Sequence, residues 1–380
     1  MKFFFNIYAS LFLNKIKVKA IVRKEMDGTR ACTTDGNYKI LKEKLKDLDE
    51  MQKYVGALKA KNVLNENFEL MEFLDSGGSS NVYSIKVKKF KDGKQIKKNV
   101  IMKAVISKKH QREVQKESML LSKLKNKNII DFYGASKGEE NQLSFIFMEE
   151  AKYGNLRNFQ KKILKRRILS ESLLNYFAAQ ILNGIDYCHK RKIAHMDIKM
   201  QNIVINELLA AKLIDFSISI NYQNKSLNEK IVLPLKGTNF YIPKEVLETA
   251  EIKYKDLHKV DLYSFGVVLY NLAFGCYPYG LTYGDEEDYG TILEKIKNNE
   301  LNLENKMGYS AHFLDFLKSL LEKDINKRIS LKEALDHYWI KGAEILNQEK
   351  EKCYNISIFF SYLLTDHIKL FNDYIMDNKL

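Results

Sequence analysis

The chain has 380 residues, 45% hydrophobic and 29% charged, and this length can bury one large core or two smaller ones. Its four cysteines lie far apart, which excludes a dense disulfide framework and a zinc site with paired cysteines, so a reducing intracellular location, the cytoplasm, is expected. Lys and Arg exceed Asp and Glu by 62 to 48, but this net charge of +14 is dispersed, so no nucleic-acid partner is predicted.

Residues 1–67 are predicted to form a leader followed by an amphipathic helix. The apolar stretch Phe3–Leu13 is too short to span a bilayer, and no small-residue cleavage site follows it. Targeting or membrane contact through residues 1–24 is therefore less favoured than an N-terminal strand or flexible leader.

Within residues 38–60, apolar side chains recur at three- and four-residue steps, which places them on one face of a helix. Docking of this helix on the adjoining domain is favoured over a coiled-coil contact with another chain, because too few heptads are present. The same helix is the candidate contact for a regulatory protein partner.

From Phe68 the pattern changes to that of an α+β lobe over residues 68–150. One helix is expected at 110–124, and five strands at 68–74, 82–87, 100–106, 129–133 and 143–148. Residues 151–340 are predicted to be mainly helical, with clear helices at 173–189, 261–274, 289–297, 311–322 and 331–339. Residues 341–380 form a C-terminal tail.

The most informative stretch is His195-Met196-Asp197-Ile198-Lys199-Met200-Gln201-Asn202, followed by Asp215-Phe216-Ser217. Together they resemble protein kinases, whose catalytic loop is His-Arg-Asp-x-x-x-x-Asn and whose metal-binding turn is Asp-Phe-Gly. Each motif carries one substitution, at Met196 and Ser217. The resemblance implies a bilobal protein-kinase fold over residues 68–340, with a small five-stranded N-lobe and a larger helical C-lobe.

The same resemblance implies ATP and Mg²⁺ as cofactors and a role for each polar group of these motifs. Asp197 resembles the catalytic base, with His195 in the same catalytic motif, and Lys199 offsets charge on the transferring phosphoryl group. Asn202 and Asp215 would supply hard oxygen ligands for magnesium. An isolated His-x-Asp is more often an ordinary hydrogen-bonded turn, so the interpretation depends on the accompanying motifs.

Upstream, Val100-Ile101-Met102-Lys103 resembles the strand whose lysine contacts the α- and β-phosphates of ATP. Glu117 on the following helix is preferred over Glu113 as its partner, although a surface charge is the simpler alternative for Glu117. In the segment that aligns with the glycine-rich phosphate loop, only Gly77 matches a family glycine.

The adenine site is also implied by the resemblance. Met148, Glu149 and Ala151 would form the hinge, with Met148 as gatekeeper and Asn155 near the ribose. The apolar side chains expected to sandwich the base are those of Val82, Ile101 and Val204. Kinases usually carry alanine where Ile101 stands, so the adenine slot is expected to be narrower here.

Two further similarities extend the match downstream. Glu245 resembles the glutamate that pairs with a buried arginine, here Arg328, and Asp261 opens the helix that anchors the catalytic loop. Lys199 and Thr238 resemble serine/threonine kinases. The expected function is therefore ATP-dependent phosphorylation of serine and threonine hydroxyls on a protein substrate.

The alternative is a pseudokinase that binds nucleotide or acts as a scaffold. It is suggested by departures from the family pattern at Asp75, Ser80, Ile101, Met196 and Ser217. It is opposed by the presence of all the catalytic groups named above, since loss of chemistry usually requires loss of one of them.

Two expectations about specificity and regulation complete the analysis. Kinases that prefer basic substrates often have glutamates where Asn155 and Gln201 stand, so arginine upstream of the acceptor should matter little. Met196 cannot donate hydrogen bonds to a phosphate, so phosphorylation at sites such as Ser219 or Ser226 should be a weak switch.

Overall fold

The computed structural model describes residues 68–76, 80–91, 94–105, 108–136, 144–162, 168–233, 239–282, 288–304 and 308–341. The predicted leader, the helix at 38–60, Gly77, Thr238 and the tail from residue 342 lie outside the described residues. The chain divides into two units, the second of which contains Lys123–Ile130 and the residues from Ala151 onward. Each unit is described separately.

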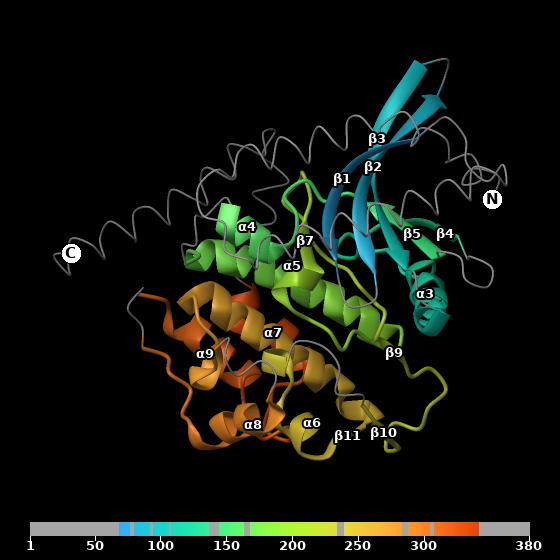
Figure 1. Cartoon of the computed structure of the whole chain (residues 1–380). Helices are drawn as coiled ribbons and strands as arrows, with labels where there is room; N and C mark the ends of the chain where they lie inside the picture. Colours follow the sequence, from blue (N-terminus) through green and yellow to red (C-terminus); the bar gives the residue numbers. More distant parts are fainter. Residues whose placement is uncertain are drawn as a thin grey trace, which may run out of the picture. The chain divides into compact units, whose positions relative to one another are not determined.

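The first unit is a five-stranded antiparallel sheet with one helix (Figure 1). Its strand order is β1-β2-β3-β5-β4, and helix α3 packs against β3, β4 and β5. The strands are β1 (Phe68–Ser76), β2 (Asn81–Lys91), β3 (Lys94–Val105), β4 (Phe132–Ser136) and β5 (Ser144–Glu149), and the helix is α3 (Lys108–Leu121). The predicted number of strands and the predicted helix are therefore present, although one strand lies elsewhere than expected.

The prediction of a strand at 129–133 is wrong, because β4 begins at Phe132. Ile129 and Ile130 are buried in the second unit instead, and the Ile130 N–H donates to the carbonyl of Leu213. An apolar run of this length cannot distinguish a strand from a buried connection, because both bury every side chain.

The second unit is mainly helical. Its longer helices are α5 (Glu171–Lys190), α7 (Leu257–Phe274), α8 (Tyr289–Asn298) and α9 (Ala311–Leu320), and its shorter ones are α4 (Leu156–Lys162), α6 (Lys244–Thr249) and α10 (Leu331–Asp336). Three two-stranded sheets pair β6 (Ile193–Ala194) with β9 (Ile220–Asn221), β7 (Ile203–Ile205) with β8 (Ala211–Leu213), and β10 (Lys230–Val232) with β11 (Glu251–Lys253). The pattern analysis did not predict α4 and α6.

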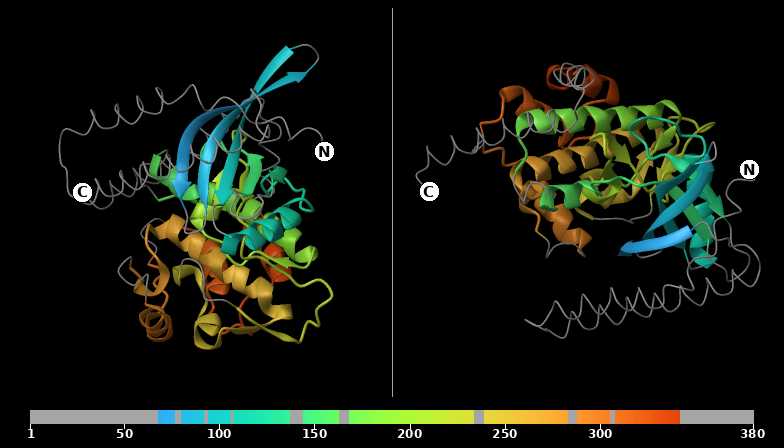
Figure 2. Two further views of the ribbon diagram at one scale, coloured as in Figure 1. Left: turned by 45° about the vertical axis from the view of Figure 1, so that its right-hand side comes forward. Right: turned by 90° about the horizontal axis from the view of Figure 1, so that it is seen from above.

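Helices α5 and α7 contact each other and form the centre of this unit (Figures 1 and 2). Ser170 caps the start of α5 by accepting the Leu173 N–H, and Gly275 ends α7 with a positive φ of 71°. Most residues of α7 are buried on all sides, which explains its nearly continuous apolar sequence. A Cβ on Gly266 would lie 2.9 Å from Leu320 Cβ, so glycine allows α7 and α9 to approach closely.

A buried ion pair joins the start of α6 to the segment that precedes α10. Arg328 donates to both carboxylate oxygens of Glu245, at 2.7 and 3.0 Å, and also to the carbonyls of Glu322 and Lys259. The Arg328 side chain has no exposed surface. Each of the three guanidinium nitrogens therefore has a hydrogen-bond partner, and the pair predicted from the sequence is present.

A second buried polar cluster links α5 to α7. His189 Nε2 lies 2.7 Å from an oxygen of Asp261, and the ring of His258 is in edge contact with that of His189. Burial alone would raise the pKa of Asp261, but hydrogen bonds from His189 and from the Met196 N–H lower it overall. Asp261 is therefore a buried carboxylate that stays charged.

Removing the charge of Glu245 should destabilise the protein strongly. Glu245→Gln leaves a buried guanidinium without its counter-charge, and we expect a loss of about 3 kcal/mol or more in the free energy of unfolding. The matched control is Glu251→Gln in the exposed Lys230–Glu251 pair, where we expect less than about 1 kcal/mol. Urea or thermal denaturation measures both, and equal effects would contradict a structural role for the buried pair.

The protonation of His258 should make stability depend on pH. Burial, and then the neighbouring His189, lower the pKa of His258 from its ordinary 6.5 to about 4. Between these values the unfolded chain binds a proton that the folded chain does not, so stability falls as pH drops from 6.5 to 4, by at most about 3 kcal/mol.

His258→Gln should remove this part of the acid destabilisation. Melting temperatures of the wild type and the variant measured across this pH range test it. The control is His312→Gln, which alters an exposed histidine of α9. Parallel curves for the wild type and His258→Gln would show that His258 does not contribute.

Candidate active site

The sheet of the first unit places four candidate nucleotide-binding side chains on one face. Residues directly opposite each other in an antiparallel pair share a face, and Val82 is opposite Lys103. Two residues earlier on β3, Ile101 lies on the same face and is opposite Met148 of β5. Val82, Ile101, Lys103 and Met148 therefore point to one side, as an adenine and phosphate site requires.

Lys103 is held by a carboxylate of α3. Its Nζ lies 2.9 and 3.1 Å from the two carboxylate oxygens of Glu117, and both side chains are buried, with 10% and 1% of their surfaces exposed. Such a pair fixes the position of the ammonium group on the sheet. The simpler alternative of a surface charge at Glu117 does not apply.

The end of β5 is fixed by side-chain bonds within the first unit. Glu150 accepts hydrogen bonds from Ser84 of β2 and Asn99 of β3, and the Glu149 N–H donates to the carbonyl of Asp131. In the second unit, the carbonyl of Ala151 accepts the Gly154 N–H, while the Ala151 N–H donates to no described residue. This N–H therefore remains available for the base contact expected at the hinge.

The catalytic-loop residues converge on one oxygen of Asp197. Lys199 Nζ lies 2.8 Å from Asp197 Oδ2, and Asn202 Nδ2 donates to the same oxygen at 2.7 Å. Asn202 also donates to the Asp197 carbonyl, which closes the loop on itself. No described residue bonds Oδ1 of Asp197, so the two carboxylate oxygens differ in their surroundings.

The His195 ring is held between the backbone groups of the catalytic loop and the Asp215 turn. Its side chain is completely buried, and the ring packs against Phe216 with 4.7 Å between centroids. Nε2 lies 3.0 Å from the Ile214 carbonyl, and Nδ1 accepts the Asp197 N–H. Both ring nitrogens are therefore occupied by backbone groups next to Asp197 and Asp215.

Asp261 of α7 fixes the backbone of the catalytic loop. Its two oxygens accept the N–H groups of His195 and Met196, each at 2.8 Å. Met196 has φ of 67°, a left-handed conformation that costs a non-glycine residue about 1 kcal/mol or more. The bond from Met196 to a buried carboxylate stabilises that conformation and so orients Asp197.

The Asp215 turn adopts a related conformation. Asp215 has φ of 65°, while Ser217 is absent from the described residues with positive φ. Serine at the family glycine position is therefore accommodated without backbone strain in this conformation. The Ile214 N–H donates to the Asn202 carbonyl, which joins the turn to the catalytic loop.

The residues of this turn and of the catalytic loop fit a magnesium ion shared with a nucleotide. Because Asn202 uses its amide nitrogen to bind Asp197, its amide oxygen is left as a possible ligand beside the Asp215 carboxylate. Among the described residues, no group of three or more His, Cys, Asp or Glu could hold a metal alone. Magnesium commonly uses few protein oxygens and completes its shell with phosphate and water.

Two other candidates are brought together in the second unit. Asn155 and Val204 form an isolated antiparallel bridge, and Val204 is buried. The Asn155 side-chain oxygen caps α4 by accepting the Asn158 N–H, so only its amide nitrogen is left for a ribose contact.

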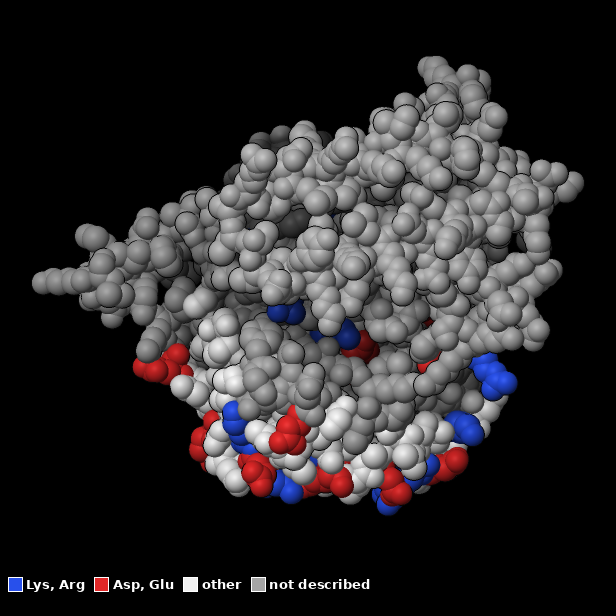
Figure 3. All heavy atoms as spheres, viewed as in Figure 1, with Lys and Arg blue, Asp and Glu red and all other residues white. Residues whose placement is uncertain are grey.

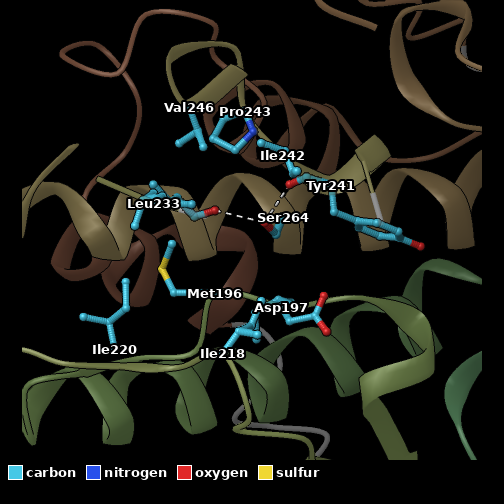
Figure 4. A pocket seen from close by; sticks show the side chains of 12 residues that line it. Met196, Asp197, Ile218, Ile220, Leu233, Tyr241, Ile242, Pro243, Val246 and Ser264 are labelled. Carbon is cyan, nitrogen blue, oxygen red and sulfur yellow. Dashed lines mark hydrogen bonds between the residues drawn. The ribbon is translucent and has the colours of Figure 1, made fainter. Parts of the chain in front are cut away.

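A small apolar pocket adjoins the catalytic loop (Figure 4). It has a volume of about 40 Å³, enough for water but not for a drug-sized ligand. Asp197 is the only charged residue among those that line it, and the apolar lining includes Met196, Ile218, Ile220, Leu233, Ile242 and Val246. A buried phosphate would find no cationic group there.

Sequence reasoning did not predict the contacts that Tyr222 and Ser219 make with this region. Tyr222 bonds His189, and Ser219 is fully buried and donates to the His195 carbonyl. Ser219 was considered as a phosphorylation site, but its burial and its bond make it inaccessible in this conformation. Only an apolar and aromatic bias after Asp215 hinted at these contacts.

On the face shown in Figure 3, acidic and basic side chains of the second unit are intermixed. No described helix combines the length and the apolar character needed to cross a bilayer. The residues considered for membrane contact, 1–24, lie outside the described part.

Comparisons with known proteins agree with the geometry. The family described as "Protein kinase domain" matches residues 68–340. The chain is 28% identical over 272 residues to a cell cycle serine/threonine-protein kinase, CDC5/MSD2 of Saccharomyces cerevisiae, covering 71% of this chain and 36% of that protein. It is 27% identical to MAP kinase kinase MKK1/SSP32 of the same yeast, covering 76% and 56%, respectively.

A third relative is calcium-dependent protein kinase 4 of Plasmodium falciparum, 32% identical over 250 residues, with 62% of this chain and 44% of that protein covered. The chain therefore spans between about a third and a little over half of the length of these relatives. Because the family match includes most of the chain and every catalytic candidate, the chain belongs to the protein kinase family.

Proposed function

We propose that this chain is an ATP-dependent serine/threonine protein kinase that transfers the γ-phosphate of ATP to protein hydroxyls. The observation that carries the proposal is the arrangement around Asp197. Lys199 and Asn202 hold one carboxylate oxygen, and the other has no described partner. This arrangement suits a base that accepts the proton of a hydroxyl as it attacks phosphorus.

Each remaining polar group has a role in the same reaction. Lys103, oriented by Glu117, would bind the α- and β-phosphates, and Lys199 would offset the negative charge that develops on the transferring group. Asn202 and Asp215 would hold magnesium, which neutralises phosphate charge when bound. His195 acts indirectly, by holding the backbone on both sides of these ligands.

Serine and threonine are favoured as acceptors for two reasons. The lysine at position 199 is the residue that resembles serine/threonine kinases. The yeast cell cycle relative is also named as a serine/threonine-protein kinase. The substrate, the regulatory partner through residues 38–60 and the cytoplasmic location remain sequence-based proposals. The described cysteines, Cys188 and Cys276, are both free thiols, which fits a reducing compartment.

The pseudokinase alternative has less support. The structure forms the Lys103–Glu117 pair and the Asp197–Asn202 bond, although Ile101, Met196 and Ser217 depart from the family pattern. A chain used only as a scaffold has no need to maintain these buried polar contacts. Direct measurement of phosphoryl transfer distinguishes an active kinase from a pseudokinase.

Asp197→Asn should lower turnover by about 10²–10⁴-fold while leaving ATP affinity nearly unchanged, because the variant lacks only the proton acceptor. Purified full-length protein is incubated with labelled ATP, magnesium and a generic acceptor protein, with Asp215→Ala as an inactive control. Nucleotide binding is measured separately. Normal turnover in Asp197→Asn would remove Asp197 from the role, and an inactive wild type that binds ATP would favour the pseudokinase.

Acceptor peptides with arginine two or three residues before the phosphorylated site should gain little. Gln201 and Asn155 are neutral amides, so neither offers a carboxylate to an arginine of the substrate. The side-chain oxygen of Asn155 already accepts the Asn158 N–H. Gln201→Glu should then raise the preference for such peptides about fivefold. Gln223→Glu, which adds the same charge at an exposed turn, is the control. A wild-type peptide array dominated by upstream arginine would contradict the prediction.

A further inference from the structure

The segment that follows the Asp215 turn is held to the rest of the second unit by backbone bonds at several points. Strand β9 pairs with β6, and the Tyr222 N–H donates to the Lys192 carbonyl. Further along, β10 pairs with β11, and the Leu233 N–H donates to the Ala250 carbonyl at 2.7 Å. These bonds require no added phosphate.

The side chains of this segment add an apolar anchor. Tyr222, Leu233 and Val246 belong to one buried cluster, and Met196 of the catalytic loop and Ile220 pack against it. The Tyr222 ring stacks on Tyr254 with 6.2 Å between centroids, and Lys192 Nζ lies 5.9 Å from its centre. The position of the ring is therefore fixed independently of its hydroxyl group.

The Tyr222 hydroxyl begins a chain of hydrogen bonds that ends at the catalytic loop. It lies 3.1 Å from His189 Nδ1, and His189 Nε2 lies 2.7 Å from Asp261. Asp261 in turn accepts the N–H groups of His195 and Met196. Residue 222, the end of α5, the catalytic loop and α7 are thus connected through two buried side chains, those of His189 and Asp261.

The direction of these bonds follows from the chemistry of the groups. A charged carboxylate can only accept, so His189 donates from Nε2, and a neutral imidazole then offers Nδ1 as an acceptor. The Tyr222 hydroxyl is the donor that satisfies this nitrogen, with a weaker alternative at the His189 carbonyl, 3.4 Å away. Without the hydroxyl, a buried acceptor on His189 loses its partner, and the ring is less firmly oriented toward Asp261.

We propose that Tyr222 is a positioning residue that couples the segment after Asp215 to the catalytic loop through His189 and Asp261, without a phosphate on that segment. The proposal deepens the kinase function and rests on it for the effect on turnover. The coupling itself is a property of the fold, because its end point is the pair of N–H groups at His195 and Met196.

The principal test is Tyr222→Phe, with Tyr254→Phe as the matched control. The first removes the hydroxyl that bonds His189, and the second removes a hydroxyl from the ring stacked on it. We expect Tyr222→Phe to lower kcat about tenfold with little change in KM for ATP, and to speed amide hydrogen exchange at His195 and Met196. Tyr254→Phe should change neither.

Three outcomes would overturn the proposal. They are unchanged kcat and exchange in Tyr222→Phe, equal effects in both variants, or faster exchange confined to the segment around residue 222. If the wild type is inactive but exchange at His195 and Met196 responds as expected, the coupling stands and the catalytic proposal fails.

A double-mutant cycle checks the route. His189→Asn should itself speed exchange at the catalytic loop, and Tyr222→Phe should then have no further effect, because the hydroxyl acts through that ring. Additive effects would place the action of Tyr222 elsewhere.

A separate experiment tests whether activity requires a phosphate on the segment that follows Asp215. Phosphatase treatment of the purified protein should leave kcat within about twofold, since the segment is held by backbone bonds and apolar contacts. A tenfold or greater loss that maps to a phosphate between Asp215 and Glu245 would contradict it.

Discussion

The catalytic half of this kinase domain depends on one buried carboxylate. Asp261 is fully buried near the start of α7, yet it remains charged because an imidazole and two backbone N–H groups donate to it. Water could not supply these bonds at full burial, so the catalytic loop must. The catalytic loop offsets the cost of desolvating the carboxylate only when its backbone has the conformation that directs these N–H groups at Asp261.

This coupling explains how the loop maintains an unfavourable backbone conformation. Met196 and Asp215 both have positive φ, and neither is a glycine. The bond that the Met196 N–H donates to Asp261 and the bond that His195 donates to the Ile214 carbonyl stabilise the two turns, and Asp197 follows directly after the first. The strain is local and is offset by contacts with α7, and it places Asp197 where Lys199 and Asn202 bond one of its carboxylate oxygens.

The departures from the family pattern are accommodated in different ways. Ser217 adopts an ordinary φ, so its side chain introduces no strain in this conformation. Met196 packs against an apolar cluster where an arginine would need a counter-charge, and Ile101 lies beside Met148 on the nucleotide face of the sheet. None of the three changes alters Lys103, Asp197, Asn202 or Asp215, the groups on which the proposed phosphoryl transfer depends.

The sequence by itself determined the family, most of the elements and the chemical groups, because periodicity and short motifs are local properties. It located α5, α7 and α9 to within a few residues, and it proposed Lys103 with Glu117 and Glu245 with Arg328 through resemblance. It missed α4 and α6, which are too short to show a period, and it misplaced β4, because Ile129 and Ile130 look like a strand when read alone. It suggested Ser219 as a phosphorylation site, which burial in this conformation makes inaccessible, and it gave no sign that the His195 ring is completely buried. Only the tertiary structure joined Tyr222, His189 and Asp261, since hydrogen bonds between residues 189, 222 and 261 depend on how α5 and α7 pack and leave no pattern in the sequence.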